Sequence, residues 1–309
     1  MPERASVAVL GIFVADLAFK APRLPVLGET ILGQGFASGP GGKGSNQAIA
    51  AARAGAAVRL ITRIGRDTFG DMAQRAWAAD GVDISAVQSD AELPTGAAFI
   101  FVSTATGDNA IIVESGAAAR LSPADVAAAA AAIAGSLVFV TQFEQPVETA
   151  LAGLRLARRH GVVTVLNPAP AVPVDPAIYG LCDFVTPNET EAATLTGRPV
   201  ETEADALEAA RALVALGARN AVITLGEKGA LLHGEAGTAM VPACRVERVV
   251  DTTGAGDAFN GGFAVALAEG RSPLDAVRFA NATAALSVQK PGTAPSMPNR
   301  AEIDALLWG

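Results

Sequence analysis

The sequence is short of the residues that build disulfide frameworks and protein-bound metal centres. Its 309 residues include two cysteines, Cys182 and Cys244, and two histidines, His160 and His233. Two cysteines are too few for a disulfide framework or a clustered metal site. Neither histidine lies in a cluster with the spacing of metal ligands. These absences argue against metal-based or histidine-based hydrolysis. A dehydrogenase has no dinucleotide-binding fingerprint to support it.

Positive charge is scarce as well. The chain has 23 Lys and Arg against 31 Asp and Glu, which gives a formal net charge of −8. The basic residues are scattered, with Arg158 and Arg159 the densest pair, and there is no basic arm or aromatic stacking platform. An acidic chain without a basic patch repels phosphate backbones and acidic membrane surfaces. We therefore expect no nucleic-acid partner.

Long apolar runs are also missing. No segment approaches the ~20 uncharged, bulky apolar residues that a membrane span needs. The N-terminal apolar run within residues 1–19 lacks a small-residue cleavage site and continues into an expected strand. The alanine run 127–132 is bounded by Asp125 and Gly135, which is typical of a helix in a soluble protein. We expect no membrane association and a cytoplasmic location.

What the sequence has is a strong alternation of short β-rich runs and longer alanine-rich helical patterns. Half of the residues are hydrophobic, so the chain can bury a large core. Expected strands cover 7–14, 57–65, 136–142, 162–167, 182–187 and 220–226, and expected helices include 44–54, 68–80, 146–160 and 202–216. The alternation predicts an α/β fold in one domain, residues 1–309, with a doubly wound, mostly parallel sheet flanked by helices.

Two segments interrupt this alternation. Residues 16–39 contain two prolines and four glycines, and residues 95–115 read as a hairpin without a partner helix. We predict that these segments together form a small β-sheet lid inserted into the main domain.

The first candidate site is "DTTGAGDAFNGGF", residues 251–263. Its glycines let the backbone turn so that N–H groups face one point, and the helix that follows adds the positive end of its dipole. Such a corner can stabilise negative charge on a transferring phosphoryl group. A carboxylate there would repel phosphate but could accept a proton from an attacking hydroxyl. Asp257 is therefore a candidate general base, and an ordinary helix N-cap is the alternative.

Two further corners open helices. In "GPGGKGSNQAIAAARAG", residues 39–55, Lys43 is followed by glycine, so this is not a Walker A loop. Lys43 and Asn46 could hold sugar hydroxyls or phosphate, or they could be solvated residues of a tight turn. In "TPNETEAATLTG", residues 186–197, Asn188 and Glu191 could order the water shell of Mg²⁺, or they could cap the helix.

Several segments resemble one family. "GGKGSNQAIAAARAG" (41–55) and "DTTGAGDAFNGGF" (251–263) resemble the two signature segments of the ribokinase family of carbohydrate kinases, also called the PfkB family. "LNPAP" (166–170), "TPNETEA" (186–192) and "TLGEKG" (224–229) resemble further segments of its ribokinase branch. The resemblance runs essentially end to end and in the same order. It implies a ribokinase-like fold and ATP-dependent phosphorylation of a sugar hydroxyl.

The resemblance also implies roles for individual residues. Asp257 would be the catalytic base, with the backbone amides of Gly254, Ala255 and Gly256 as the anion hole. The implied sugar contacts are Asp16, Gly42, Lys43, Asn46 and Glu144. The implied nucleotide contacts are Asn188, Thr224, Gly226, Gly229 and Asn281. Asn188 and Glu191 match a motif that helps to organise Mg²⁺ through water.

Two further expectations come from the resemblance. A monovalent-cation site, through which K⁺ activates the enzyme, is implied at Asp251, Thr253, Gly292 and Ser296, the last two in the loop 290–296. The lid segments match those that close over the sugar and pair between the subunits of a homodimer.

One position departs from the pattern. Ribokinases usually read Asn-Ala-Asp after the first strand, whereas this chain has Val14 in place of the asparagine. A sugar-facing amide is missing, unless a neighbouring group or water replaces it.

The expected acceptor is a hydroxyl, in the first place a primary one, of D-ribose. Another pentose, a ketohexose, a sugar acid or a nucleoside is the alternative. A non-catalytic sugar sensor is the rival from another class, but it would tolerate loss of the base, which this chain retains.

Overall fold

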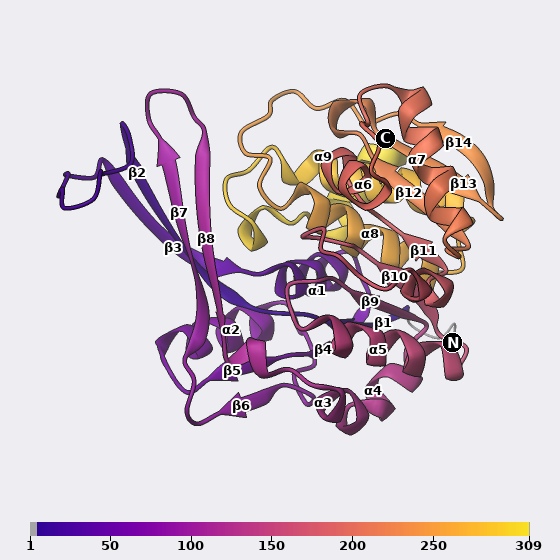
Figure 1. Ribbon diagram of the computed structural model, residues 1–309, viewed down its shortest axis with the longest axis horizontal. Helices are drawn as coiled ribbons and strands as arrows, with labels where there is room; N and C mark the ends of the chain where they lie inside the picture. Colours follow the sequence, from indigo (N-terminus) through magenta and orange to yellow (C-terminus); the bar gives the residue numbers. More distant parts are fainter. Residues whose placement is uncertain (1–4, 309) are drawn as a thin grey trace.

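A central sheet organises the molecule (Figure 1). The computed structural model describes residues 5–308. The sheet has eight strands in the order β14-β13-β12-β11-β10-β9-β1-β4. Strands that pair in parallel are β1 (Ser6–Leu10), β4 (Ala57–Ile61), β9 (Val138–Thr141), β10 (Val163–Leu166), β11 (Phe184–Val185) and β12 (Asn220–Thr224). The hairpin of β13 (Ala230–Gly234) and β14 (Gly237–Val241) completes one edge in antiparallel pairing.

Both faces of this sheet are buried. In β1, Val7 and Val9 belong to one hydrophobic core, and Ala8 and Leu10 belong to another, because successive side chains point to opposite faces. The first core is covered by α1 (Lys43–Arg53), α2 (Thr68–Ala79), α8 (Ala255–Ala268), α9 (Pro273–Ser287) and α10 (Arg300–Trp308). The second is covered by α3 (Pro123–Ala128), α4 (Ala130–Ala134), α5 (Val147–Arg159), α6 (Glu189–Thr196) and α7 (Glu203–Ala215). The predicted doubly wound α/β fold is confirmed.

Short elements complete the main body. Strand β5 (Arg63–Gly65) pairs with β6 (Gln88–Asp90) outside the large sheet. Four 3₁₀ turns are η1 (Ala117–Arg120), η2 (Pro176–Leu181), η3 (Gly226–Lys228) and η4 (Ala294–Ser296). Among residues 5–308, every helix is too short or too polar to cross a membrane.

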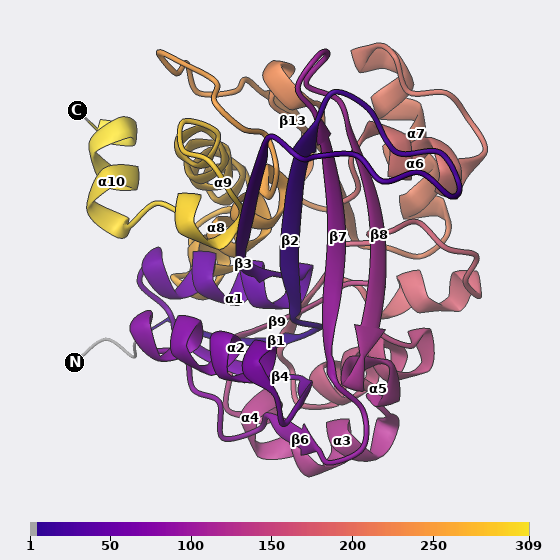
Figure 2. The ribbon, with the colours of Figure 1, turned by 90° about the vertical axis from the view of Figure 1, so that its left-hand side faces the viewer.

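A second sheet projects from the body, and its presence was predicted. It has the order β3-β2-β7-β8, formed by β2 (Val14–Ala21), β3 (Gly35–Gly41), β7 (Thr95–Ser103) and β8 (Asn109–Gly116). Figure 2 shows these four long strands side by side, facing the viewer. We call this four-stranded unit the small sheet.

The junction between the sheets differs from the sequence prediction. One strand was predicted over residues 7–14, but β1 ends at Leu10 and Val14 begins β2 of the small sheet. The side chains at this junction belong to different cores. Phe13 packs edge-on against Trp77 in the first core, whereas Ile12 and Val14 lie in a separate cluster with Ala98. Because the residues on both sides of the junction are apolar, the sequence gives no sign of the point where the chain leaves one sheet and enters the other.

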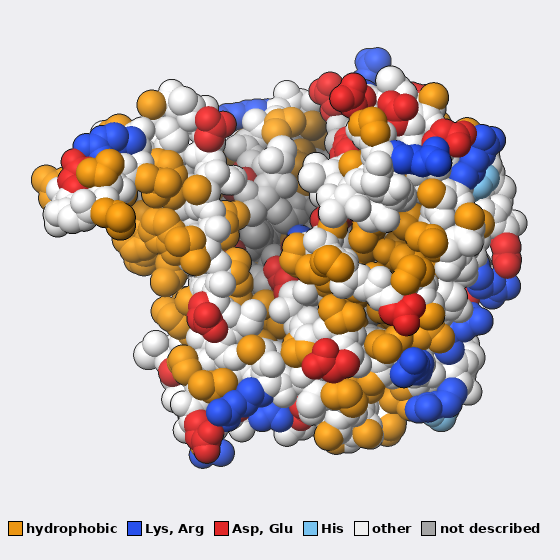
Figure 3. Space-filling model, in the orientation of Figure 1, with side chains coloured by type: hydrophobic (Ala, Val, Ile, Leu, Met, Phe, Trp, Pro, Cys, Tyr) orange, Lys and Arg blue, Asp and Glu red, His pale blue; other side chains and the backbone are white. Residues whose placement is uncertain are grey.

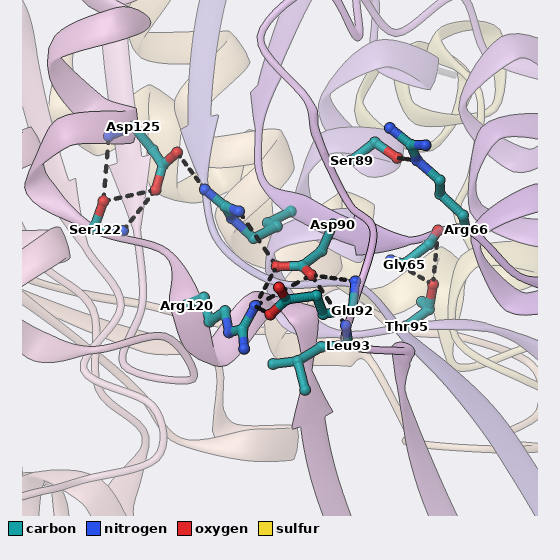
Figure 4. A network of polar contacts seen from close by, with 11 residues as sticks. Gly65, Arg66, Ser89, Asp90, Glu92, Leu93, Thr95, Arg120, Ser122 and Asp125 are labelled. Atoms are coloured by element: carbon teal, nitrogen blue, oxygen red, sulfur yellow. Dashed lines mark hydrogen bonds and ion pairs between the residues drawn. The ribbon is translucent and has the colours of Figure 1, made fainter.

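The base of the small sheet is held by buried charge (Figure 4). The carboxylate of Asp90 accepts hydrogen bonds from the backbone N–H groups of Glu92 and Leu93 and pairs with Arg63 and Arg120. Arg63 also pairs with Asp125 at the start of α3. These contacts connect β5, β6 and η1, which lie next to one end of β7 and β8. They therefore hold together the segments from which the small sheet projects.

Candidate functional site

A polar pocket lies where the parallel strands of the large sheet end, the usual ligand position in open α/β sheets. Asn167, Thr186 and Thr224 stand at or just beyond the ends of β10, β11 and β12. The other lining residues are Lys43, Ala169, Asn188, Glu191, Gly254, Gly256, Asp257 and Asn260. Figure 3 shows the surface hollowed between the projecting small sheet and the main body.

The N-terminus of α8 forms one wall of the pocket. Gly254 is the N-cap, with φ of 79°, a left-handed conformation that glycine adopts without strain. The N–H of Ala255 bonds to the carbonyl of Thr252, so one of the three expected anion-hole amides already has an acceptor. Gly256 lines the pocket, and the N–H groups of a first helical turn have no acceptor within the helix. The helix end can therefore bind an anion.

Asp257 lies in the first turn of α8 and is 5% exposed. Asn46 Nδ2 donates to Asp257 Oδ2 over 2.9 Å. Gln47 Nε2 donates to Asp257 Oδ1 over 3.0 Å. The side chain does not cap its own helix, so the N-cap alternative is not what the structure shows. Gln47 carried no signal in the sequence analysis, because its role depends on α1 and α8 meeting.

The N-terminus of α1 faces the same point. Its N-cap is Gly42, with φ of 85°, and the backbone N–H of Lys43 donates to Glu144 Oε2 over 2.8 Å. Burial lowers the pKa of the Lys43 ammonium, but the carboxylates of Asp257, Glu144 and Glu191 outweigh this and raise it above its usual value. Lys43 therefore stays charged among several acidic groups.

Two carboxyl groups reach the site from outside the glycine-rich corners. Burial raises the pKa of Glu144 to about 7, although Lys43 opposes the shift. Burial also raises the pKa of Asp16, on β2, to about 6; a hydrogen bond with Thr293 opposes this and Asp257 adds to it. Thr293 Oγ1 lies 3.3 Å from Asp16 Oδ2 and donates to the Pro40 carbonyl over 2.9 Å. Thr293 thus links the small sheet to the 290–296 loop, which the sequence did not indicate.

Asn188 and Glu191 form the capping arrangement that was the alternative at this position. Asn188 Oδ1 accepts from the Glu191 N–H, and Glu191 Oε2 accepts from the Asn188 N–H. Both residues still line the pocket, and Glu191 keeps a second carboxylate oxygen. Residues 5–308 contain no group of three or more His, Cys, Asp and Glu side chains that could hold a metal. The pair therefore fits Mg²⁺ held through water and ligand oxygens, not a protein-only cage.

The residues expected to contact the nucleotide do not all line the pocket. Thr224 lines the pocket and forms a parallel bridge with Asn188. Gly226 and Gly229 delimit the turn η3 that follows β12. Asn281 is buried on α9, where its Nδ2 donates to the carbonyls of Val241 and Pro242, so it shapes the segment after β14.

Three of the four expected cation residues, Asp251, Thr253 and Gly292, are joined by hydrogen bonds, whereas Ser296 bonds to Thr293 of the same loop. Asp251 accepts hydrogen bonds from the backbone N–H groups of Thr253 and Gly292, at 2.9 Å each. Ser296 is fully buried, and its Oγ donates to the Thr293 carbonyl. Arg53, which the sequence analysis did not single out, donates to the carbonyls of Ala294 and Met297 while it pairs with Asp80. The end of α1 therefore anchors this loop.

Comparisons with known proteins agree over nearly the whole chain. The model of the pfkB family carbohydrate kinases matches residues 4–300. Ribokinase of Haemophilus influenzae is 40% identical over 97% of this chain and 97% of its own length. Deoxyribokinase of Salmonella typhi is 38% identical over 97% of this chain and 98% of its own length. The structure of Arabidopsis thaliana ribokinase complexed with ribose and ATP superposes with a TM-score of 0.92, at 32% identity, and each chain is 99% covered.

The buried carboxyl of Glu144 predicts a pH-dependent effect on stability. Its pKa is raised from 4.5 to about 7, so the folded state binds the proton more tightly than the unfolded chain. Stability is then lost as pH rises from about 4.5 through about 7. Glu144→Gln, which cannot ionise, should raise the melting temperature at pH 8 and leave it nearly unchanged at pH 5.

Glu148→Gln is the matched control, because Glu148 is exposed on α5. It should change the melting temperature little at either pH. An equal effect of Glu144→Gln at pH 5 and pH 8 would contradict the buried charge.

Proposed function

We propose that D-ribose is the sugar that this chain phosphorylates. The chain belongs to the pfkB family of carbohydrate kinases and is an ATP-dependent sugar kinase. The observation that carries the proposal is the placement of Asp257 at the N-terminus of α8, beside Lys43 and within the electrostatic reach of Asp16 and Glu144. Carboxylates suit sugar hydroxyls, and the helix end suits a phosphoryl group. The ribokinases among its relatives support ribose as the sugar.

Each residue then has a distinct part in the transfer. Asp16 and Glu144 accept hydrogen bonds from sugar hydroxyls and orient a hydroxyl, the primary one in our proposal, toward Asp257. Asp257 takes the proton of that hydroxyl as its oxygen attacks the γ-phosphorus of ATP. The amides at the start of α8 and the Lys43 ammonium stabilise the charge that develops on the transferring group. Phosphoryl transfer depends mostly on such positioning and electrostatic stabilisation.

ATP would lie on the side of the pocket lined by Asn188 and Thr224, with the η3 turn alongside. The residues present fit Mg²⁺ at Asn188 and Glu191 through water, and the ion would neutralise phosphate charge. Asn281 supports the segment after β14, which we place near the adenine. We also propose a cytoplasmic enzyme, because its co-substrate is abundant there.

Asp257→Asn tests the base and separates a kinase from a sugar sensor. The amide cannot take the hydroxyl proton, so kcat should fall by roughly 10²–10⁴-fold while ATP binding survives. ADP release measured with MgATP and ribose gives kcat, and calorimetric titration gives ATP affinity. Wild-type protein that binds ribose without releasing ADP would identify a sensor, and near-normal turnover by the variant would remove Asp257 from the mechanism.

Val14 favours one second candidate, a sugar that lacks a hydroxyl. Val14 and Asp16 are two apart on β2 and so lie on the same face of the small sheet. Val14 is 3% exposed and packs with Ile12 and Ala98. It has no polar atom for a ribose hydroxyl, and an unsatisfied hydroxyl costs about 1–3 kcal/mol. The deoxyribokinase relative is consistent with 2-deoxyribose as this alternative.

Val14→Asn should raise kcat/KM for ribose relative to 2-deoxyribose by about five- to 150-fold, the range that 1–3 kcal/mol spans. Both sugars are measured with the same enzyme preparation, so a general loss from placing an amide in the apolar cluster cancels in the ratio. Val14→Thr, of similar shape, is the milder companion variant. A ratio unchanged in folded Val14→Asn protein would show that residue 14 does not set specificity.

We further propose a K⁺ site at Asp251, Thr253, Gly292 and Ser296. Gly254, whose amide belongs to the expected anion hole, directly follows Thr253 and lies against Thr293 of the 290–296 loop. A bound cation would therefore fix the amides at the start of α8. Potassium should raise activity above that in sodium or a bulky organic cation at matched ionic strength. Identical rates in the three salts would contradict the site, and the matching removes effects of screening.

The outer face of the small sheet supports a homodimer. Phe19, Phe36 and Phe99 contact one another and are 41%, 61% and 36% exposed. They alternate with the inward-facing Asp16, so they point away from the pocket, and Figure 3 shows hydrophobic side chains gathered over the projecting sheet. We propose that a second copy of the chain covers them. Sedimentation velocity should then show a dimer, and a monomer at micromolar concentration would exclude it.

A further inference from the structure

The side chain of Gln47 contacts the proposed base, although none of the roles described above belongs to it. Gln47 lies in the first turns of α1 and is 1% exposed. Its Nε2 donates one hydrogen bond to Asp257 Oδ1 and one to Asn167 Oδ1, both over 3.0 Å. Its Oε1 accepts from Gln142 Nε2 over 2.5 Å. The amide therefore uses both of its protons and its oxygen.

The neighbours allow one orientation of this amide. Asn167 Nδ2 donates to the Thr186 carbonyl, so Asn167 must turn its oxygen toward Gln47. Asp257 likewise offers only acceptors when it is ionised. A flipped Gln47 amide would place its oxygen against two oxygens and its NH₂ against the NH₂ of Gln142. Asn167 thus fixes which end of Gln47 faces the base, and Gln142 holds the other end.

Gln47 and Asn46 together hold both oxygens of Asp257. Asn46 donates to Oδ2 and Gln47 donates to Oδ1, so the plane of the carboxylate cannot rotate about its Cβ–Cγ bond without losing a hydrogen bond. Each carboxylate oxygen can accept more than one hydrogen bond, and each accepts one here, so a lone pair remains for the acceptor hydroxyl. Proton transfer depends steeply on this geometry.

We propose that Gln47 is a positioning residue for Asp257, and that Gln142 acts one step further out by orienting Gln47. This inference rests on the proposed function, because it assigns Gln47 to the base of that reaction. Asn46 is one of the sugar contacts that the sequence resemblance implies, whereas the Gln47 amide also bonds to Asn167 and Gln142. Gln47 therefore affects the rate of transfer and not the affinity for either substrate.

The test compares near-isosteric substitutions at three buried glutamines. Gln47→Met removes both donors, and we expect kcat to fall about 10- to 100-fold while KM for ATP and for ribose stays within about twofold. Gln142→Met removes the group that orients Gln47, and we expect kcat to fall about three- to tenfold. Gln145→Met is the matched control. Gln145 is also buried, and its amide bonds to Thr141 and the Gln142 carbonyl and not to Gln47.

A double-mutant cycle distinguishes positioning from loss of stability. If Gln47 acts through Asp257, adding Gln47→Met to Asp257→Asn should leave the residual kcat unchanged within about twofold. A further drop as large as that of Gln47→Met alone would overturn the inference, as would a kcat loss in Gln145→Met equal to that in Gln47→Met. If Gln47→Met does not fold, a normal kcat in folded Gln142→Met overturns it. An unchanged kcat in Asp257→Asn alone would instead contradict the proposed function.

Discussion

The meeting of two helix N-termini, those of α1 and α8, is the constraint on which the site depends. The two helices pack closely at Gly261 of α8, where an added Cβ would lie 2.5 Å from Ala50 Cβ of α1. Small residues at this contact bring Asn46 and Gln47 of one helix to the carboxylate of Asp257 on the other. The same approach directs two helix dipoles toward one pocket, which favours anionic ligands.

Charge within the pocket is unbalanced without ligands. Burial raises the pKa of the Asp16, Glu144 and Glu191 carboxyl groups, and the nearby carboxylate of Asp257 adds to each shift. Lys43 keeps its charge because Asp257, Glu144 and Glu191 outweigh the effect of its own burial. Sugar hydroxyls and a divalent cation are the groups that would compensate such carboxylates. The pocket thus suits a sugar, whose hydroxyls donate hydrogen bonds, and in our proposal it also binds phosphate together with a metal ion.

The sequence predicted most of the architecture because the large sheet is built from local, repeating units. The expected helices 44–54, 68–80, 146–160 and 202–216 correspond to α1, α2, α5 and α7 with ends shifted by about one residue. The strand over 7–14 was wrong because its apolar run serves three clusters, and periodicity cannot tell one core from another. The hairpin β13–β14 was not predicted, although turn glycines flank it.

The candidate site was likewise predicted only in part. Glycine-rich corners revealed Asp257, Lys43 and Asn46, since their chemistry is local to a helix start. Gln47, Arg53 and Thr293 gave no local signal, because each acts across segments that are far apart in sequence. Asn188 and Glu191 cap α6 and also line the pocket, so one short pattern was compatible with both readings.

In the mechanism we propose, the buried carboxylate of Asp257 takes the proton of a sugar hydroxyl as that hydroxyl attacks the γ-phosphorus of ATP. The most direct measurement is ³¹P NMR of the wild-type protein with MgATP, alone and with D-ribose or 2-deoxyribose. The account predicts that ADP and a sugar phosphate monoester form in equal amounts only when the sugar is present. Formation of ADP and inorganic phosphate with no sugar ester, or no consumption of ATP with either pentose, would contradict it.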